Sequence, residues 1–188
     1  MILDTPTPSQ KNSSGTTYIM SAATSAYRLI PYAGNAGNLT NITVNADRIH
    51  YIPFSLSKPE TVTELATQIQ TIGWTKARVW IYSNTSDSPD KLLVSTGDIT
   101  TTSTGYQSDV VNYTLQEGTI YWIALISTWF GARWVGNANI LPKFGYLGSW
   151  ITSPSYLYED VAPGWTTLPA QAGSLTAFVG TAPVVYMN

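Results

Sequence analysis

The sequence predicts an all-β fold, a jelly-roll-like β-sandwich of about eight or nine strands with an extended N-terminal arm. Three observations support this prediction. Short segments rich in β-branched and aromatic residues are separated by turn clusters roughly every 8 to 12 residues. No segment shows convincing helical periodicity. The run Ile120–Ile126 is apolar on both faces of an extended chain, which is typical of a central strand covered on both sides.

The beginning of the chain differs in composition from the rest. Residues 1–24 are rich in Pro, Ser, Thr and Gly and have too few large apolar side chains to form a core of their own. We therefore expect an extended arm that becomes ordered against a partner. Residues 25–188 then form the sandwich domain, and a chain of this size usually makes one domain.

Nine segments of the sandwich domain are predicted strands. In chain order they are 27–32, 41–56, 62–72, 77–84, 91–100, 108–115, 118–128, 139–147 and 175–182. In the fourth of these, Val79 and Ile81 point to one side, whereas Arg78, Trp80 and Tyr82 point to the other. This alternation predicts a strand with one face in the core and the other face in water.

A long excursion, residues 142–173, separates the last two predicted strands. Structureless loops longer than about 12 to 15 residues in compact domains are usually either functional or disordered. The aromatic residues of the excursion argue against disorder. They are Phe144, Tyr146, Trp150, Tyr156, Tyr158 and Trp165. We therefore expect a loop with a binding role.

Charge and cysteine content exclude several classes of function. Charged residues make up only 11% of the chain and the formal net charge is −2, so nucleic acid binding would lack its main electrostatic contribution. The apolar run Ile120–Ile126 is far shorter than the roughly 20 residues that a membrane helix needs. The absence of cysteine leaves no thiolate ligand and no cysteine nucleophile. We expect neither nucleic acid nor membrane as a partner.

Signals for catalysis and metal binding are weak. The single histidine, His50, has no nucleophile elbow to accompany it. Glu159 and Asp160 are candidate glycosidase carboxylates, but neighbours on an extended chain point to opposite sides. Asp87 and Asp90 lack the ligand series of a calcium loop, and a turn explains them better. We therefore expect no enzymatic activity, no catalytic residue, no bound metal and no cofactor.

The aromatic content, 7 Trp and 12 Tyr, exceeds what a core of this size can hide. We expect the core to take Trp80 or Trp122, together with Tyr121 and Phe54. The others should meet a partner, because Trp, Tyr and Arg are enriched at protein interfaces and flat rings also suit sugar faces. Both kinds of partner remain open. The predicted partner or glycan surface consists of Trp129, Arg133, Trp134, Trp150, Tyr156, Tyr158 and Trp165.

A resemblance to a known family covers roughly residues 48–128. It rests on the stretches "IPFSLSKPETVTELATQIQTIG", "ARVWIYSNTSDSPDKLLVSTGDITTTSTGYQ" and "YTLQEGTIYWIALIST". These are similar to small β-sandwich modules, themselves like carbohydrate-binding jelly rolls, on the virion surface proteins of tailed bacteriophages. The resemblance implies a location on the virion surface and a role without catalytic turnover.

Two placements on a phage particle follow from the resemblance. A tail-fibre protein normally carries a long shaft ahead of its tip, whereas only residues 1–24 precede the sandwich here. This favours a head decoration or cement protein, a class that is short and often trimeric and clamps capsid subunits with an arm. The expected partners are the major capsid protein and further copies of the chain, as a homotrimer. The alternative is a tail-fibre-tip protein that binds a host cell-surface glycan.

Attachment through the arm is expected to depend on its few large apolar side chains. These arm anchors are Ile2, Leu3, Tyr18, Ile19 and Met20. Backbone hydrogen bonds from the arm would add a strand to the edge of a partner's sheet.

Overall fold

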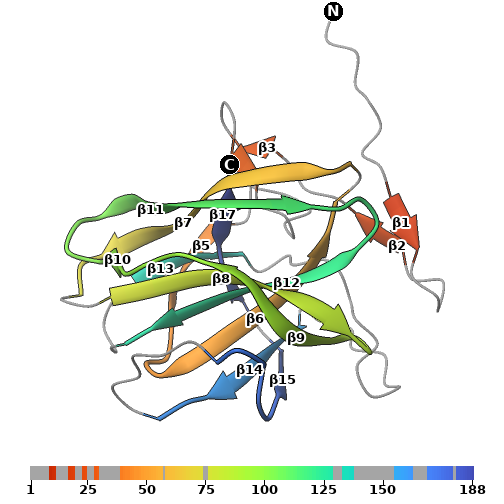
Figure 1. Ribbon diagram of the computed structural model, residues 1–188. Coiled ribbons are helices and arrows are strands. Elements are labelled where there is room, and N and C mark those ends of the chain that lie inside the picture. Colours follow the sequence, from red (N-terminus) through yellow and green to blue (C-terminus); the bar gives the residue numbers. More distant parts are fainter. Residues whose placement is uncertain are drawn as a thin grey trace, which may run out of the picture.

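The computed structural model of the chain is built from strands arranged in two large antiparallel sheets (Figure 1). It describes residues 9–11, 17–19, 23–24, 28–29, 39–56, 58–73, 76–128, 133–137, 155–162, 169–179 and 181–188. Among these residues there is no helix, and hence none long and apolar enough to cross a membrane. The predicted all-β class and the packing of two sheets are confirmed.

The first sheet contains the strands that the sequence marks most strongly. Its order is β10 (Ile99–Thr100), β8 (Lys76–Thr85), β12 (Ile120–Ser127), β6 (Arg48–Ser55), β14 (Ser155–Asp160) and β15 (Thr176–Val179), and β9 (Ser88–Ser95) also pairs with β8. The strand β12 lies between β8 and β6, with Ala124 opposite Trp80 on one side and Tyr51 on the other. The most apolar strand therefore has a central position, as its sequence predicts.

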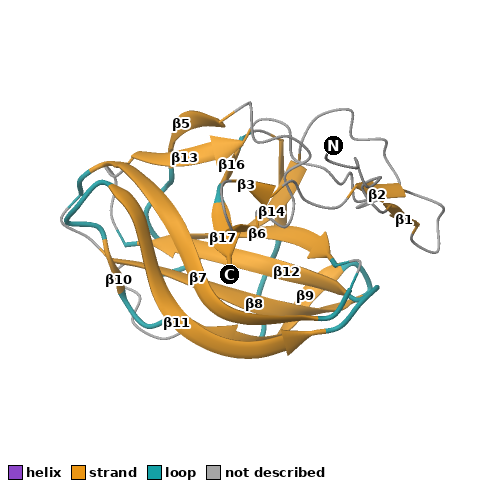
Figure 2. Cartoon of the chain, turned by 90° about the horizontal axis from the view of Figure 1, so that it is seen from above, coloured by secondary structure: helices purple, strands orange, loops and turns teal. Residues whose placement is uncertain are grey.

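The second sheet covers one face of the first. Its order is β16 (Ala182–Pro183), β13 (Arg133–Asn137), β7 (Glu60–Thr71), β17 (Val185–Met187), β4 (Arg28–Leu29) and β3 (Ala23–Thr24); β11 (Gly105–Leu115) also pairs with β7, and β5 (Leu39–Thr43) pairs with β13. Seen from above, β7 and β11 run side by side in long curves over the strands of the first sheet (Figure 2).

Within the predicted arm, the described strands behave in two ways. β1 (Ser9–Lys11) and β2 (Thr17–Ile19) form a two-stranded antiparallel sheet of their own. β3, by contrast, pairs with β4 and so joins the second sheet. The boundary at residue 24 and the jelly-roll connectivity both remain predictions.

The main core fills the space between the two sheets. From β12 it receives Tyr121, Ile123 and Leu125, whereas Trp122 and Ala124 project from the opposite face of the same strand and are also buried. The prediction that this strand is covered on both sides is therefore confirmed.

A second apolar cluster lies on the outer face of the first sheet. It comprises Ile49, Tyr51, Trp80, Tyr82, Trp122, Ala124, Ile126 and Leu157. The expectation that Trp80 and Tyr82 face water is therefore wrong, because both side chains are completely buried. Trp80 and Trp122 are both core residues, although only one of them was expected in the core. Alternation along β8 identifies two faces correctly, but it cannot show that further chain covers the second face.

The predicted strand segments agree with the structure best where the apolar pattern is strong. Segments 77–84 and 118–128 correspond to β8 and β12. Segment 41–56 is divided into β5 and β6 by a turn at Asp47, whose φ is 55°. The excursion 142–173 is not loop throughout, because β14 lies within it and pairs with β6. Segment 139–147 lies outside the described residues.

The strand β11 places two consecutive valines in opposite environments, because successive side chains of an extended strand point to opposite faces. Its register with β7 shifts between Val110 and Tyr113. Val110 is 80% exposed, whereas Val111 is 6% exposed and belongs to the main core. These neighbours form a matched pair for measuring the contribution of the core.

We expect Val111→Ala to lower the free energy of unfolding by about 2 kcal/mol, because it removes two buried methyl groups and leaves a small cavity. The same change at Val110 should cost no more than about 0.5 kcal/mol, since that side chain is already in water. Urea-induced unfolding followed by circular dichroism measures both. Equal losses for the two variants would contradict the opposite orientations described for these side chains.

Candidate functional site

The residues of the predicted partner surface do not lie on one sheet. Strand β13 of the second sheet carries Arg133 and Trp134, whereas β14 of the first sheet carries Tyr156 and Tyr158. Outside the described residues lie Trp129, Trp150 and Trp165, together with the side chains of Arg133, Trp134 and Tyr156. The described part of the surface is therefore the surroundings of Tyr158.

Tyr158 lies beside an ion pair that joins β6 to β14. Arg48 Nε and Asp160 Oδ1 are 2.6 Å apart, and a second guanidinium nitrogen lies 3.1 Å from Asp160 Oδ2. The guanidinium carbon of Arg48 also lies 3.9 Å from the centre of the Tyr158 ring. Such a cation–π contact occupies one face of the ring. That face is therefore not open to stacking by a ligand.

The neighbouring acids Glu159 and Asp160 have different partners. Asp160 pairs with Arg48, as described, whereas Glu159 Oε2 accepts a hydrogen bond of 2.9 Å from the Tyr51 hydroxyl on the outer face of the sheet. The prediction that the two carboxylates diverge along an extended strand is confirmed. They do not flank a common site in the manner of a glycosidase pair.

A short segment closes the outer aromatic cluster and was not foreseen from the sequence. This segment, Pro169–Gly173, is called the strap here because it connects β8 and β9 to β14. At one end the Tyr82 hydroxyl donates to the carbonyl of Pro169 over 2.8 Å. At the other end the Gly173 amide donates to Glu159 Oε2 over 3.0 Å. Glu159 thus holds both the strap and the buried hydroxyl of Tyr51.

Backbone hydrogen bonds fix the middle of the strap to β9. The Leu92 amide donates to the Ala170 carbonyl over 3.1 Å, and the Ala172 amide donates to the Asp90 carbonyl over 3.3 Å. The side chain of Gln171 donates to Asp90 Oδ1 over 2.8 Å. The strap therefore continues the sheet over its outer face, and this part of the predicted binding loop serves as a cover.

Burial keeps the phenols beneath the strap neutral. Burial raises the pKa of Tyr82 to about 12, and it raises the pKa of Tyr51 further, with Tyr82 and Glu159 adding to the effect. The rings of Tyr51 and Tyr82 meet edge to face with centroids 5.5 Å apart. Trp122 Nε1 donates to Asn84 Oδ1 over 2.8 Å at the border of the cluster. These groups therefore act as fixed hydrogen-bond donors in a packed layer.

The junction between the strap and β14 allows a double-mutant test. A Cβ at Gly173 would overlap Glu159 Oε1, so Gly173→Ala should cost about 1–3 kcal/mol of stability through overpacking. In a Glu159→Ala background the overlap is gone, and the same glycine change should cost less than about 0.5 kcal/mol. Denaturant unfolding of the four proteins gives the coupling. Additive effects would mean that the strap does not contact Glu159 as described.

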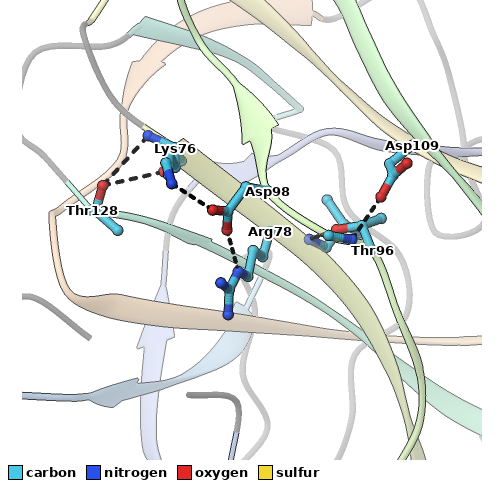
Figure 3. A network of polar contacts seen from close by, with 8 residues as sticks. Lys76, Arg78, Thr96, Asp98, Asp109 and Thr128 are labelled. Carbon is cyan, nitrogen blue, oxygen red and sulfur yellow. Dashed lines mark hydrogen bonds and ion pairs between the residues drawn. The ribbon is translucent and has the colours of Figure 1, made fainter. Parts of the chain in front are cut away.

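A second polar network fastens the beginning of β8 to the turn before β10 (Figure 3). Asp98 accepts from Lys76 Nζ at 2.7 Å and from Arg78 Nε at 2.6 Å. The hydrogen bond from Lys76, followed by that from Arg78, holds the pKa of Asp98 below its ordinary value. Since Lys76 and Asp98 are partly open to solvent, such pairs contribute little to stability. The network orients strand ends and leaves no unpaired charge for a ligand.

Of the two candidate calcium ligands, Asp87 lies in a tight turn and Asp90 lies on the strand β9 that follows it. Ser86 and Asp87 both have positive φ, 51° and 60°, at the turn between β8 and β9. The carboxylate of Asp90 accepts from Thr85 and from Gln171. Across the described residues no group of three potential metal ligands comes together. The predicted turn is therefore present at Asp87.

His50 is a buried residue of β6. Its side chain is 5% exposed. Burial, aided by the charge of Arg48 and partly opposed by that of Asp160, lowers its pKa from 6.5 to about 3. The folded protein therefore holds this imidazole neutral at pH values where an unfolded chain would protonate it.

Acidification should consequently destabilise the fold through His50. Because its pKa is about 3 in the folded protein, against an ordinary value of 6.5, stability is complete above about pH 7.5 and decreases as the pH falls. At pH 5 the loss from this residue amounts to about 2 kcal/mol. We expect the His50→Gln variant to lose about that much less between pH 8 and pH 5, as measured by urea unfolding. Identical losses in both proteins would contradict a buried neutral imidazole.

Comparisons with known proteins add no family to these observations. No protein-family model matches the chain, and a search of curated proteins found no match. The functional interpretation therefore depends on the residues and geometry described above.

Proposed function

We propose that this chain is a non-enzymatic structural protein on the surface of a tailed phage particle, where it decorates the head and stabilises the capsid. The observation that carries the proposal is the separation of the β1–β2 hairpin, which pairs with neither large sheet in the described part of the chain. An element held apart from a packed sandwich is suited to contact something else. The resemblance of residues 48–128 to virion surface modules supplies the setting.

The packing of the sandwich supports a mechanical role. Two apolar clusters bury both faces of the first sheet, and the strap packs Ala172 against the outer cluster and accepts a hydrogen bond from Tyr82. Only 11% of the residues are charged, so attachment would rely on apolar and backbone contacts more than on ion pairs. A rigid sandwich domain with a separate arm is suited to a protein that reinforces a capsid.

Attachment would proceed through the arm. Tyr18 and Ile19 lie on β2, whereas the anchors Ile2, Leu3 and Met20 lie outside the described residues. The arm would add a strand to the major capsid protein or to a neighbouring copy. Several arms in a homotrimer would convert modest contacts into firm attachment, because each binding event raises the effective concentration of the next.

The alternative is a receptor-binding protein at a tail-fibre tip. The aromatic residues of 142–173 favour this alternative, since Trp and Tyr rings suit the apolar faces of sugars. In that case the glycan would be held by rings other than Tyr51, Trp80, Tyr82 and Trp122, which are buried in the outer cluster. The location of the protein on the particle separates the two functions.

Deletion of residues 1–21 tests the decoration mechanism. We expect the truncated protein to remain soluble, because every described member of both apolar clusters lies beyond position 40. It should bind particles lacking the native protein at least about tenfold more weakly, because strand addition is lost. Occupancy is measured by electron microscopy and sedimentation. Full occupancy without the arm would overturn arm-mediated attachment, and density at the tail tip would favour the receptor-binding alternative.

A further inference from the structure

The strand β11 forms an edge of the second sheet with which another strand could pair. It is 11 residues long, and within the described residues its only ladder partner is β7. After Asp109 its residues, Val110 to Leu115, carry no charge and are mostly β-branched or aromatic. A long edge strand with an uncharged half rich in such residues is a template for another strand. Val110, 80% exposed, adds an apolar side chain on the outer surface.

Asp109 occupies this edge in a specific way (Figure 3). Its Oδ2 accepts a hydrogen bond of 2.6 Å from the amide of Gly97, in the connection between β9 and β10 of the first sheet. Its Oδ1 accepts one of 2.9 Å from the amide of Val110, on β11 itself. One carboxylate therefore satisfies a backbone donor from each sheet where their margins meet.

The position of Gly97 indicates that this contact is built closely. A Cβ at Gly97 would lie 3.1 Å from Asp109 Oδ2, which is tighter than ordinary contact. The glycine thus allows the carboxylate to reach the backbone amide. Hydrogen bonds to an ionised acceptor are stronger than neutral ones, so the arrangement closes the margin between the two sheets.

We propose that Asp109 is an edge guard that prevents another β-strand, in particular β11 of a second copy, from adding to this side of the sandwich. An incoming strand would have to replace the two hydrogen bonds and desolvate the carboxylate. Antiparallel pairing of two β11 edges would also bring the two Asp109 charges into one interface, where like charges repel. Copies of the chain would then meet through other surfaces. The inference concerns the sandwich alone and does not depend on the proposed function.

Two matched substitutions distinguish the role of Asp109 at the edge from the general effect of losing one negative charge. Asp109→Asn removes the charge and places an amide donor against a backbone donor, while Asp87→Asn removes the same charge from an exposed turn. We expect the Asp109 variant to show at least about tenfold faster hydrogen exchange at the amides of Gly97 and Val110. We also expect its molecular mass in solution to rise with concentration above that of the wild-type protein. Light scattering measures that mass. The Asp87 variant should match the wild type in both respects.

A second pair distinguishes the hydrogen bonds from the charge. Asp109→Lys removes the acceptor from the same amides but restores a charge to the edge. We therefore expect rapid hydrogen exchange at Gly97 and Val110 without association. The control, Asp87→Lys, should keep the wild-type mass. If Asp109→Asn does not fold, Asp109→Ser, which is neutral and retains a hydroxyl acceptor, takes its place in the test. The inference is overturned if the neutral variant keeps the mass of the Asp87 control at every concentration, or if the lysine variant associates to the same extent.

Discussion

The first sheet carries large aromatic and aliphatic side chains on both faces, so a single partner sheet cannot remove all of them from water. The second sheet covers the inner face, where Ile123 and Leu125 lie. The outer face, with Trp80 and Trp122, requires another layer. Because these are the two largest completely buried side chains described, the cost of leaving them exposed would be several kcal/mol, on the order of 1.5–3 kcal/mol for each large side chain. Most of the remaining architecture follows from covering this outer face.

That requirement explains the unusual mixture of apolar and polar groups in the outer layer. Tyrosine hydroxyls cannot be buried without partners, and the strap provides them through the carbonyl of Pro169 and, indirectly, through Glu159. The charged pairs of the described residues lie at strand ends and sheet margins, as with Arg48 and Asp160. The outer layer is therefore held by packing and by hydrogen bonds such as those of Tyr51 and Tyr82, whereas the charged pairs orient the surrounding elements.

The sequence predicts those features that depend on local pattern. Apolar residues on both faces identify β12 as central, and divergent side chains separate Glu159 from Asp160. It does not predict that the outer face of the first sheet is covered, because residues 169–173 of the strap, apart from Gln171, are small and carry no periodic signal. It likewise misses β14, whose pairing with β6 depends on contacts across the chain. Asp109 is a further residue of this kind, since nothing local reveals that Gly97 lies within reach of its carboxylate.

The place of β17 in the second sheet has a consequence for how the chain acquires its structure during synthesis. This strand lies between β7 and β4, and its neighbour Val184 accepts a hydrogen bond from Thr67, 117 positions earlier. A ribosome must therefore release the chain as far as Met187 before the sheet can be completed, and loop closure over such separations is slow. In the interval β7 lacks its neighbour on one side. Nascent chains that emerge close together would then be prone to intermolecular pairing at β7. A chaperone that shields this strand would have to act before residue 185 is synthesised.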